Sequence, residues 1–557
     1  MNAFLLLLIG SFPLLLVTFA GQRYARWTLL LAPLPALVAA VVLPVGATVS
    51  LPWLLLGVEL GLDDTGRVFL LFSALLWLVV SLYSAGSPAG ENAGDTRFRI
   101  FFLLAMAGNL GLIVAQDMVS FYLGFTLMGL AAYGLIAHPG SQHARAAARR
   151  YLVWTIAGEL VLFIALVMLA AQHDGALSFS VLDSAPPAGF VVLLLVIGFG
   201  IKLALPGLHF WLPQAYAVAP APAVAVLSGA MIKTGLLGWI RFLPVGGAML
   251  AGWGQALIVI GVTGIFFGAI LGLMQHRPRL LLGYSSISKM GMLTTGMGAA
   301  LAWPAAAPVL TGALTLYAAH HALVKGSLFL GLGLVERGGL RPWVLAGLGL
   351  LALSLAGAPL TSGALAKSLL TAGLPVEAQY LVSLFAVSVF ATTLLMARFL
   401  LLVWAGRRAA PSRYSLASAA AWLALLAMIA VVPFALAGAG QLFANAVPVS
   451  LGALLALLVV LATARMPVRV ATHKRRNAAT RVALRSVCGR QALRRVTAVS
   501  ENAHLLWQNA YTAMRRAPGY RRLLPRQSID GENPWPLAGS LWLVIGALLL
   551  VAFALMA

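Results

Sequence analysis

Apolar stretches follow one another along almost all of this chain, and each is about as long as a bilayer is thick. A helix needs about 20 mostly apolar residues to cross a membrane, and sixteen stretches approach or exceed that length. The chain is 61% hydrophobic and only 9% charged, which is far from the composition of soluble domains. We therefore predict an all-α polytopic membrane protein. The predicted spans are 2–19, 27–47, 66–84, 98–115, 118–137, 150–171, 189–214, 222–243, 251–273, 280–300, 307–334, 343–371, 378–404, 415–438, 447–465 and 535–556.

The first span is expected to be a retained helix, because it has neither a charged region before it nor a clean A-x-A cleavage site after it.

The chain has a net charge of +23, and its basic and acidic residues fall in different loops. If the N-terminus is outside, the inside loops hold the arginines Arg23, Arg26, Arg97, Arg99, Arg145, Arg149, Arg150, Arg277, Arg279, Arg337, Arg341, Arg407, Arg408 and Arg413. The outside loops hold the acids Glu59, Asp63, Asp64, Asp117, Asp174, Asp183 and Glu377, and little positive charge beyond Arg241. This alternation follows the positive-inside rule. It predicts a multi-pass protein of a bacterial inner membrane with both termini outside and the basic loops in the cytoplasm.

Residues 466–534 form a basic segment before the last span. Its arginines alternate with apolar residues, and Glu501 is the only acid before its final residues. A basic, partly amphipathic segment beside a membrane is expected to lie on the anionic inner leaflet. We predict that it binds anionic lipid on the cytoplasmic side. A tethered segment without a recognition motif does not point to nucleic acid.

Lysine is rare in the chain and is concentrated where a charge is most costly. Five of the six lysines fall inside apolar stretches. A lysine can release its proton when it is desolvated, whereas an arginine stays charged. The pattern therefore predicts reversible protonation within the membrane. The five are Lys202, Lys233, Lys289, Lys325 and Lys367, and Lys474 alone lies in a polar region.

Two predicted spans contain a proline close to one of these lysines. Pro206 follows Lys202 by four residues, and Pro359 precedes Lys367 by eight. A helix broken at membrane depth exposes backbone groups that are tolerated only in a hydrated or protein-packed site. Breaks in corresponding positions of two halves are typical of transporters built from inverted repeats. We predict two inverted five-helix units, spans 4–8 and spans 9–13.

The resulting division of the chain has six parts. They are 1–97 (spans 1–3), 98–243 (first half), 244–405 (second half), 406–465 (spans 14 and 15), 466–534 (basic surface segment) and 535–557 (last span).

The sequence provides no sign of bound redox chemistry. Cys488 is the single cysteine, so neither a disulfide framework nor a Cys/His metal or iron–sulfur site is expected. No flavin, quinone or nucleotide motif is evident. We expect no catalytic centre, no metal and no cofactor in this chain, so that its energy source lies elsewhere.

Five strings resemble one membrane family. They are KLALPGLHFWLPQAYAVAPAPAVAVLSGAMIKTGLLGWIRF (202–242), YLGFTLMGLAAYGLI (122–136), LGYSSISKMG (282–291), HHALVKGSLFL (320–330) and PLTSGALAK (359–367). The strings are similar to those of the antiporter-like subunits of respiratory complex I, of membrane-bound hydrogenases of the formate-hydrogenlyase type, and of Mrp-type sodium/proton antiporters. The first string favours the hydrogenase, Mrp and middle complex I subunits, while the sixteen-span layout favours the distal complex I subunit. The branch therefore stays open.

The resemblance implies a role for each matched residue. Lys202 matches the central lysine of the broken seventh helix, and Lys233 matches the connecting lysine of the eighth. His321 and Lys325 match the HAxxK element of the hydrated central axis. Lys367 matches the terminal lysine of the broken twelfth helix, at the proton exit.

One departure from the family concerns an acid. The family's fifth helix carries a glutamate that pairs with the central lysine, and this chain has Thr126 there. Glu159, in the sixth span, is a candidate replacement partner for Lys202. The alternative is that Glu159 packs neutrally and that the pump is degenerate.

Three further residues are less decisive. Lys289 either extends the row of lysines or reaches an interface with its ammonium. His209 is expected to fix the broken helix by hydrogen bonding. His320 is expected to pack in the core, facing a different side from His321.

The sequence therefore predicts a proton-translocating, or Na⁺-translocating, antiporter-like subunit of a multi-subunit membrane complex. Its expected partners are other integral membrane subunits and a redox module or an opposing ion gradient. The first alternative is a proton-driven subunit of an inorganic-carbon uptake complex with a zinc-enzyme partner. The second is a structural anchor with a vestigial channel, which Thr126 favours and the retained lysines oppose.

Overall fold

The computed structural model describes residues 2–22, 25–86, 95–183, 187–406, 415–437 and 445–465. In these residues, each of the first fifteen predicted spans coincides with one helix or with two shorter helices in succession. The predicted last span, 535–556, and the basic segment 466–534 lie outside the described residues.

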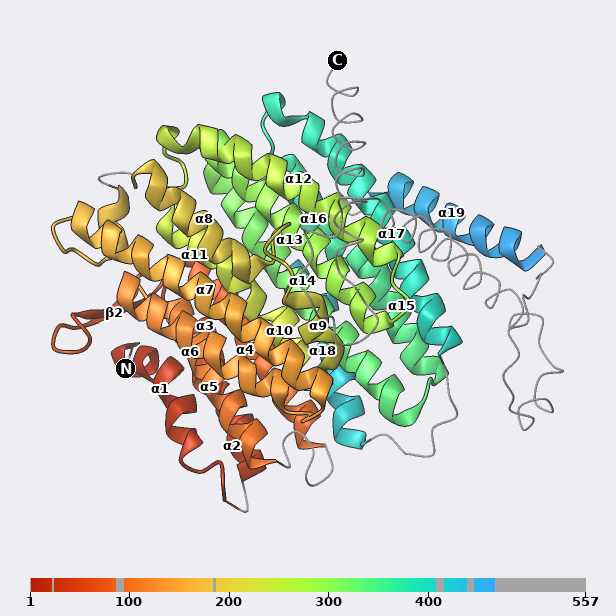
Figure 1. The fold of residues 1–557 in the computed structure, drawn as a ribbon, viewed down its shortest axis with the longest axis horizontal. Helices are drawn as coiled ribbons and strands as arrows, with labels where there is room; N and C mark the ends of the chain where they lie inside the picture. The colour runs from red at the N-terminus through yellow and green to blue at the C-terminus, as the bar shows by residue number, and fades with distance from the viewer. Residues whose placement is uncertain are drawn as a thin grey trace, which may run out of the picture. The chain divides into compact units, whose positions relative to one another are not determined.

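The helices of the first half and those before it are α1 (Asn2–Val17), α2 (Ala25–Leu31), α3 (Leu34–Val42), α4 (Asp64–Ala85), α5 (Thr96–Val114), α6 (Met118–Ala137), α7 (Gln142–Gln172), α8 (Gly189–Leu203), α9 (Leu212–Val218), α10 (Ala221–Gly229) and α11 (Thr234–Phe242). Those that follow are α12 (Ala251–Leu273), α13 (Pro278–Ala302), α14 (Ala307–Gly338), α15 (Pro342–Ala356), α16 (Ser362–Ala372), α17 (Tyr380–Ala405), α18 (Leu416–Ala437) and α19 (Ala446–Arg465). Figure 1 shows their order along the chain.

The protein is a multi-pass integral membrane protein. Within the described residues, eight helical spans are long and apolar enough to cross a bilayer, and several shorter apolar helices accompany them. The span that contains α14 and the span of α10 and α11 are almost wholly buried by other helices. By contrast, α7 exposes Val153, Leu160 and Phe163, as expected of a helix that faces lipid. The fold thus has a protein-packed interior and a lipid-facing rim.

Helix α14 lies at the centre of this packing. It contacts α4, α10, α13, α15, α16 and α18. Elsewhere α5 packs along α6, α7 along α8, and α12 along α13 (Figure 1). A helix with so many protein neighbours can hold polar groups away from lipid, and α14 contains two histidines and a lysine.

The structure corrects three of the predicted boundaries. The span predicted at 27–47 is divided into α2 and α3 around Pro33. The span predicted at 222–243 is interrupted by a short 3₁₀ helix, η3 (Met231–Lys233). The span predicted at 150–171 begins at Gln142, because the Ser141 side chain accepts a hydrogen bond from Ala144 and caps the helix.

The prediction of a purely helical protein was also incomplete. A two-stranded antiparallel hairpin, β1 (Ala47–Leu51) and β2 (Val58–Leu62), occupies the region predicted as a loop. Its second strand is held against the start of α6, since Gln116 N–H donates to Glu59 O at 2.8 Å. Short β-branched runs such as ATVSL indicate strands, but they are easily missed between long apolar spans.

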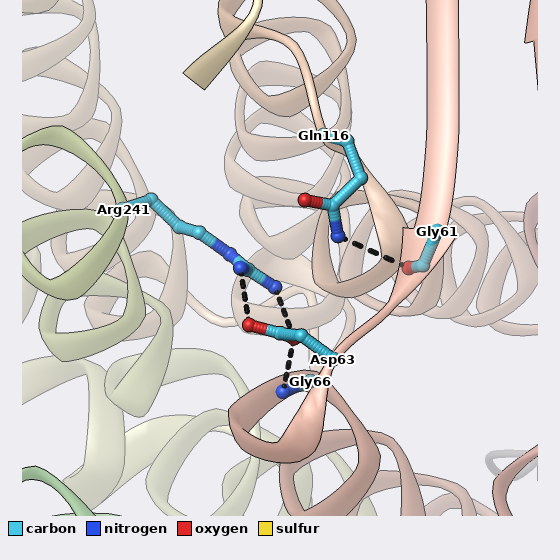
Figure 2. Close-up of polar contacts among 5 residues, drawn as sticks. All are labelled: Gly61, Asp63, Gly66, Gln116 and Arg241. Carbon is cyan, nitrogen blue, oxygen red and sulfur yellow. Dashed lines mark hydrogen bonds and ion pairs between the residues drawn. The ribbon is translucent and has the colours of Figure 1, made fainter. Parts of the chain in front are cut away.

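An ion pair anchors the hairpin end of this bundle (Figure 2). Asp63 caps α4 by accepting from Gly66 N–H at 2.8 Å. The same carboxylate receives two hydrogen bonds, of 2.6 and 2.8 Å, from the guanidinium of Arg241 at the end of α11. Nearby, Gln116 donates to Gly61 O at 3.2 Å. Residues 178 positions apart in the chain are thus joined by a charge-assisted bidentate contact.

Residues up to 449, apart from 404–406, form one compact unit. Of the other described residues, 404–406 and 450–465 belong to a second unit, in which α19 exposes Leu451, Leu454 and Leu457. All candidate site residues belong to the first unit.

Candidate functional site

All five lysines of the apolar stretches are buried in the first unit. They lie on α8, at the end of η3, and on α13, α14 and α16. A buried ammonium needs acceptors or a countercharge, because transfer out of water without them is costly. The surroundings of each lysine therefore indicate what it can do.

Lys202 lies in the last turn of α8, where the helix is interrupted. Ala204 adopts a left-handed backbone conformation with φ of +54°, and Pro206 follows in the gap before α9. The indole N–H of Trp211 donates to Ile201 O at 2.8 Å, a carbonyl that also accepts from Ala204 N–H at the end of the helix. The lysine is thus held at a helix end rather than within a continuous helix.

The ammonium of Lys202 faces two aromatic rings. Its Nζ lies 5.2 Å from the ring centre of Phe125 and 6.0 Å from that of Tyr151. Aromatic faces stabilise a cation at such distances by about 0.5–2 kcal/mol. Phe125 immediately precedes Thr126 on α6, so this helix contacts the lysine through a ring.

Glu159 is buried on α7 and interacts electrostatically with Lys202. Within the described residues no direct ion pair joins the two side chains, and Oε1 of Glu159 has no hydrogen-bond partner. Its carboxylate lies against Gly129 of α6, where an added Cβ would be only 2.4 Å from Oε1. The hydroxyl of Thr126 is likewise unpartnered. The structure thus brings Glu159 near Lys202 without closing the contact.

Lys233 lies at the junction of η3 and α11 and is fully buried. Its ammonium donates to Ser228 O, close to the C-terminal end of α10. The C-terminal end of a helix carries partial negative charge on its free carbonyls. The interruption therefore supplies this lysine with an acceptor.

Helix α14 supplies His321 and Lys325. The Lys325 ammonium donates to Leu282 O of α13 at 2.8 Å. His321 is fully buried, and neither of its ring nitrogens has a hydrogen-bond partner. An imidazole with both nitrogens free can accept a proton on one side and release one on the other.

Lys289 is fully buried on α13, so its ammonium does not reach a membrane interface. It donates to the hydroxyl of Thr392 on α17. Electrostatic interactions connect it to Lys325 and to Lys367. Lys289 therefore interacts both with the lysine of α14 and with the lysine of α16.

Lys367 lies on α16, just after the second interrupted helix. Its ammonium donates to Leu355 O at 3.1 Å and to Ala356 O, the last carbonyls of α15. Gly357, with φ of +88°, ends α15, and Pro359 lies in the gap before α16. The ammonium thus provides hydrogen bonds to carbonyls at the C-terminal end of α15.

The groups fall into two sets. Glu159 interacts with Lys202 on the side of the first interruption. The other set lies around α14 and is connected by further interactions, among them Lys233 with Lys325 and His321 with both of these lysines. The second set consists of Lys233, His321, Lys325, Lys289, His320 and Lys367.

His209 was expected to fix the broken helix by hydrogen bonding. Its Nδ1 has no hydrogen-bond partner, and its ring packs against Phe210 and Phe267 at 4.6 and 4.7 Å between ring centres. Trp211, two residues later, makes the hydrogen bond that fixes the interrupted helix.

His320 is buried as expected, but it is also hydrogen-bonded. Its Nδ1 lies 2.9 Å from Oγ of Ser362 on α16. Sequence reasoning missed Ser362, Ser354 and Thr392 as polar partners, although the hydroxyls in PLTSGALAK were visible. In the described part of the chain, no group of three or more His, Cys, Asp or Glu side chains is arranged to hold a metal ion.

Comparison with known proteins identifies the family to which these features belong. Residues 115–395 match the family model described as "NADH:quinone oxidoreductase/Mrp antiporter, TM". The matched region contains all five buried lysines, Glu159 and both interrupted helices. The resemblance drawn from the sequence strings is thereby confirmed.

Among curated proteins, the chain is 32% identical over 290 residues to NADH-quinone oxidoreductase subunit N of Desulforudis audaxviator. That alignment covers 50% of this chain and 56% of the relative, so the chain spans about half the length of the curated relatives that it matches.

Two solved structures share the fold. A chain of the Mrp complex from Dietzia sp. DQ12-45-1b has a TM-score of 0.67 at 22% identity, with 81% of this chain and 96% of that chain covered. A chain of the membrane-bound sulfane sulfur reductase, an archaeal respiratory membrane complex, has a TM-score of 0.69 at 22% identity. Coverage in that case is 98% of this chain and 100% of the other.

Proposed function

Because this chain belongs to the NADH:quinone oxidoreductase/Mrp antiporter transmembrane family, we propose that it is a proton-translocating subunit of a multi-subunit membrane complex. The proposed path runs through the buried lysines and histidines of the first unit. The relatives named above are a quinone oxidoreductase subunit and chains of Mrp and sulfur-reductase complexes. The energy source is then a partner redox module or an opposing ion gradient.

The observation that carries this proposal is the pairing of lysines with helix interruptions. Lys202, Lys233 and Lys367 each lie beside the C-terminal end of a half-helix. Free carbonyls at such ends stabilise an ammonium, yet they are neutral and do not lock the charge as a carboxylate would. A lysine held in this way can lose and regain a proton without leaving a buried anion behind.

The order of the elements supports two inverted halves. Counting predicted spans, the fourth span of the first half is α8 with α9, and the fourth span of the second half is α15 with α16. Both are interrupted, and each carries a lysine next to the gap. Five spans are an odd number, so the second unit enters the membrane from the opposite side and presents its gap in the opposite direction.

Glu159 is the proposed countercharge for Lys202. It is buried, faces α6 and interacts electrostatically with that lysine. It takes over the role of the acid that Thr126 replaces. The two side chains interact without a direct ion pair, which suits a group that must gain and lose its partner.

The remaining features concern placement in the cell. We propose a bacterial inner membrane with both termini outside, and contact of residues 466–534 with anionic lipid at the cytoplasmic face. Other integral membrane subunits are the proposed neighbours.

Lysine-to-arginine substitutions test the proposal, because arginine keeps the charge but cannot release the proton. We expect Lys202→Arg and Lys367→Arg to abolish coupled proton movement in membrane vesicles that contain the whole complex, energised by its substrate or by an imposed sodium gradient. The alanine variants should fail equally. Lys474→Arg, in the polar segment, is the matched control and should leave transport unchanged.

Assembly should be normal in each variant when the complex is resolved by native electrophoresis. Normal proton movement in Lys202→Arg would contradict the proposed relay. Movement of Na⁺ alone, with no change in internal pH, would assign the path to Na⁺ instead.

A further inference from the structure

The two adjacent histidines of α14 have different surroundings. His321 makes no hydrogen bond through either ring nitrogen, whereas Nδ1 of His320 lies 2.9 Å from Oγ of Ser362. Oγ of Ser362 lies in turn 3.0 Å from Oγ of Ser354. All three side chains are at least 95% buried. An unbroken hydrogen-bonded chain therefore runs from α14 through α16 to α15.

The interruption of the twelfth span makes this chain possible. Ser354 lies in the last turn of α15, and Ser362 is the first residue of α16, so the gap around Pro359 turns the two hydroxyls toward each other. Gly363 permits the close approach. A Cβ at this position would lie 1.8 Å from Ser354 O and 3.1 Å from the His320 ring.

The chain ends beside Lys367. The ammonium of this lysine donates to the carbonyls of Leu355 and Ala356, the two residues that follow Ser354. At the other end, Nε2 of His320 is buried without a hydrogen-bond partner, and the ring interacts electrostatically with Lys289 and Lys367. A free nitrogen at one end and a lysine at the other are the termini that a relay requires.

We propose that His320, Ser362 and Ser354 relay protons between the central lysines and Lys367. The inference rests on the proposed function and assigns to it a route through the second half. It gives His320 a role in transfer, beyond the packing role expected from the sequence.

The transfer conserves atoms and charge. His320 receives a proton at Nε2 and releases the one on Nδ1 to Oγ of Ser362. The hydroxyl proton of Ser362 passes to Ser354, and that of Ser354 passes through a water molecule to the neutral amine of Lys367. Both serines end as hydroxyls, because a hydroxyl can donate and accept at once. The reverse sequence serves the opposite direction.

Alanine substitutions of the serines test the relay in vesicles that contain the whole complex. A positioned proton-transfer group typically contributes a factor of about 100 or more, so Ser362→Ala and Ser354→Ala should each slow proton movement by at least about tenfold. The double variant should be no slower than either single variant, because a chain interrupted once is already interrupted. Ser362→Thr retains the hydroxyl and should keep most of the activity.

Ser368→Ala is the matched control. Ser368 is buried on the same helix, but its hydroxyl bonds only to Leu365 O at 2.9 Å, and its removal should not change the rate. Normal transport in Ser362→Ala, additive losses in the double variant, or equal losses in Ser362→Thr and Ser362→Ala would each overturn the relay.

Lys367→Arg, measured in the same vesicles, separates this result from the proposed function. If Lys367→Arg blocks transport while Ser362→Ala does not, the relay alone is wrong. If Lys367→Arg transports normally, the proposed function is wrong.

Discussion

At the scale of single residues, the buried lysines are held mainly by neutral oxygen atoms. Lys233, Lys325 and Lys367 donate to backbone carbonyls, and Lys289 donates to a hydroxyl. Among the described residues, Lys202 alone of these lysines interacts with an acid, and no direct ion pair joins the two. Neutral partners lower the cost of burying the charge while leaving it free to change. The residue that most distinguishes the first half is therefore Glu159.

Glu159→Gln is expected to reduce proton movement strongly, because the amide removes the negative charge near Lys202. The double variant Thr126→Glu with Glu159→Gln should recover part of the activity, since Thr126 is half-buried on α6 and directly follows Phe125, whose ring faces the Lys202 ammonium. Proton uptake by energised vesicles measures both. Unchanged transport in Glu159→Gln would assign this glutamate a packing role, and Thr126 would then mark an altered half-channel.

At the scale of secondary-structure elements, the second interruption depends on one glycine. A Cβ added at Gly363 would lie only 1.8 Å from Ser354 O. Helices α15 and α16 could therefore not keep their present contact if residue 363 were an alanine. Overpacking of this kind typically costs about 1–3 kcal/mol. We expect Gly363→Ala to lower the thermal midpoint of the complex in detergent and to slow proton movement.

Gly349→Ala, on the neighbouring helix α15, is the control for this change. Nothing lies within 4 Å of its Cβ position, so stability and transport should be unaffected. If Gly363→Ala and Gly349→Ala had the same thermal midpoint and the same rate of proton movement, the close contact between α15 and α16 would not be needed for stability or transport.

The Asp63–Arg241 contact ties the start of α4 to the end of α11. Burial raises the pKa of the Asp63 carboxyl, but the charge and hydrogen bonds of Arg241 outweigh burial and hold it below its ordinary value. The stabilisation is therefore present above the unfolded pKa, near 3.8, and is lost as the pH falls through the lower folded value. At neutral pH the pair is fully formed.

Asp63→Asn should keep the helix cap and lose the ion pair, whereas Asp63→Ala should lose both. Loss of a cap typically costs about 1 kcal/mol, so the alanine variant should be less stable than the asparagine variant by about that amount. Thermal unfolding at neutral pH measures the difference. Equal stability of the two variants would show that the cap contributes nothing.

How much of this could be predicted from the sequence differs by element. Long apolar runs located the helices of the first fifteen predicted spans, since membrane thickness fixes helix length, and the prolines indicated where α8 and α15 end. The break at η3 has no proline and was missed. The partners of the lysines could not be predicted, because a carbonyl acceptor such as Leu282 O has no sequence signature. The Asp63–Arg241 ion pair could not be predicted either, because its two residues lie 178 positions apart in the chain.

At the scale of the whole molecule, three of the loops that carry acids in the first half lie together. The β2 strand bridges to Ala115, and Asp117 bridges to Ser178. The side chain of Asp117 also accepts from Glu59 N–H at 2.9 Å. The loops that were assigned to the outside from their charge are thus neighbours in space. One helix, α7, leads from the arginine-bearing end to this acidic end over 31 residues.

The positive-inside rule then predicts which end of α7 faces the cytoplasm. Ala146 and Gln172 are exposed near its two ends, and Cys488 is the chain's single cysteine. In a Cys488→Ser background, Gln172→Cys should react with a membrane-impermeant maleimide in intact spheroplasts, and Ala146→Cys should react only after lysis. The two sites lie on the same helix, so each controls for expression and insertion of the other. Labelling of Ala146→Cys from outside would invert the topology, and with it the assignment of residues 466–534 to the cytoplasmic leaflet.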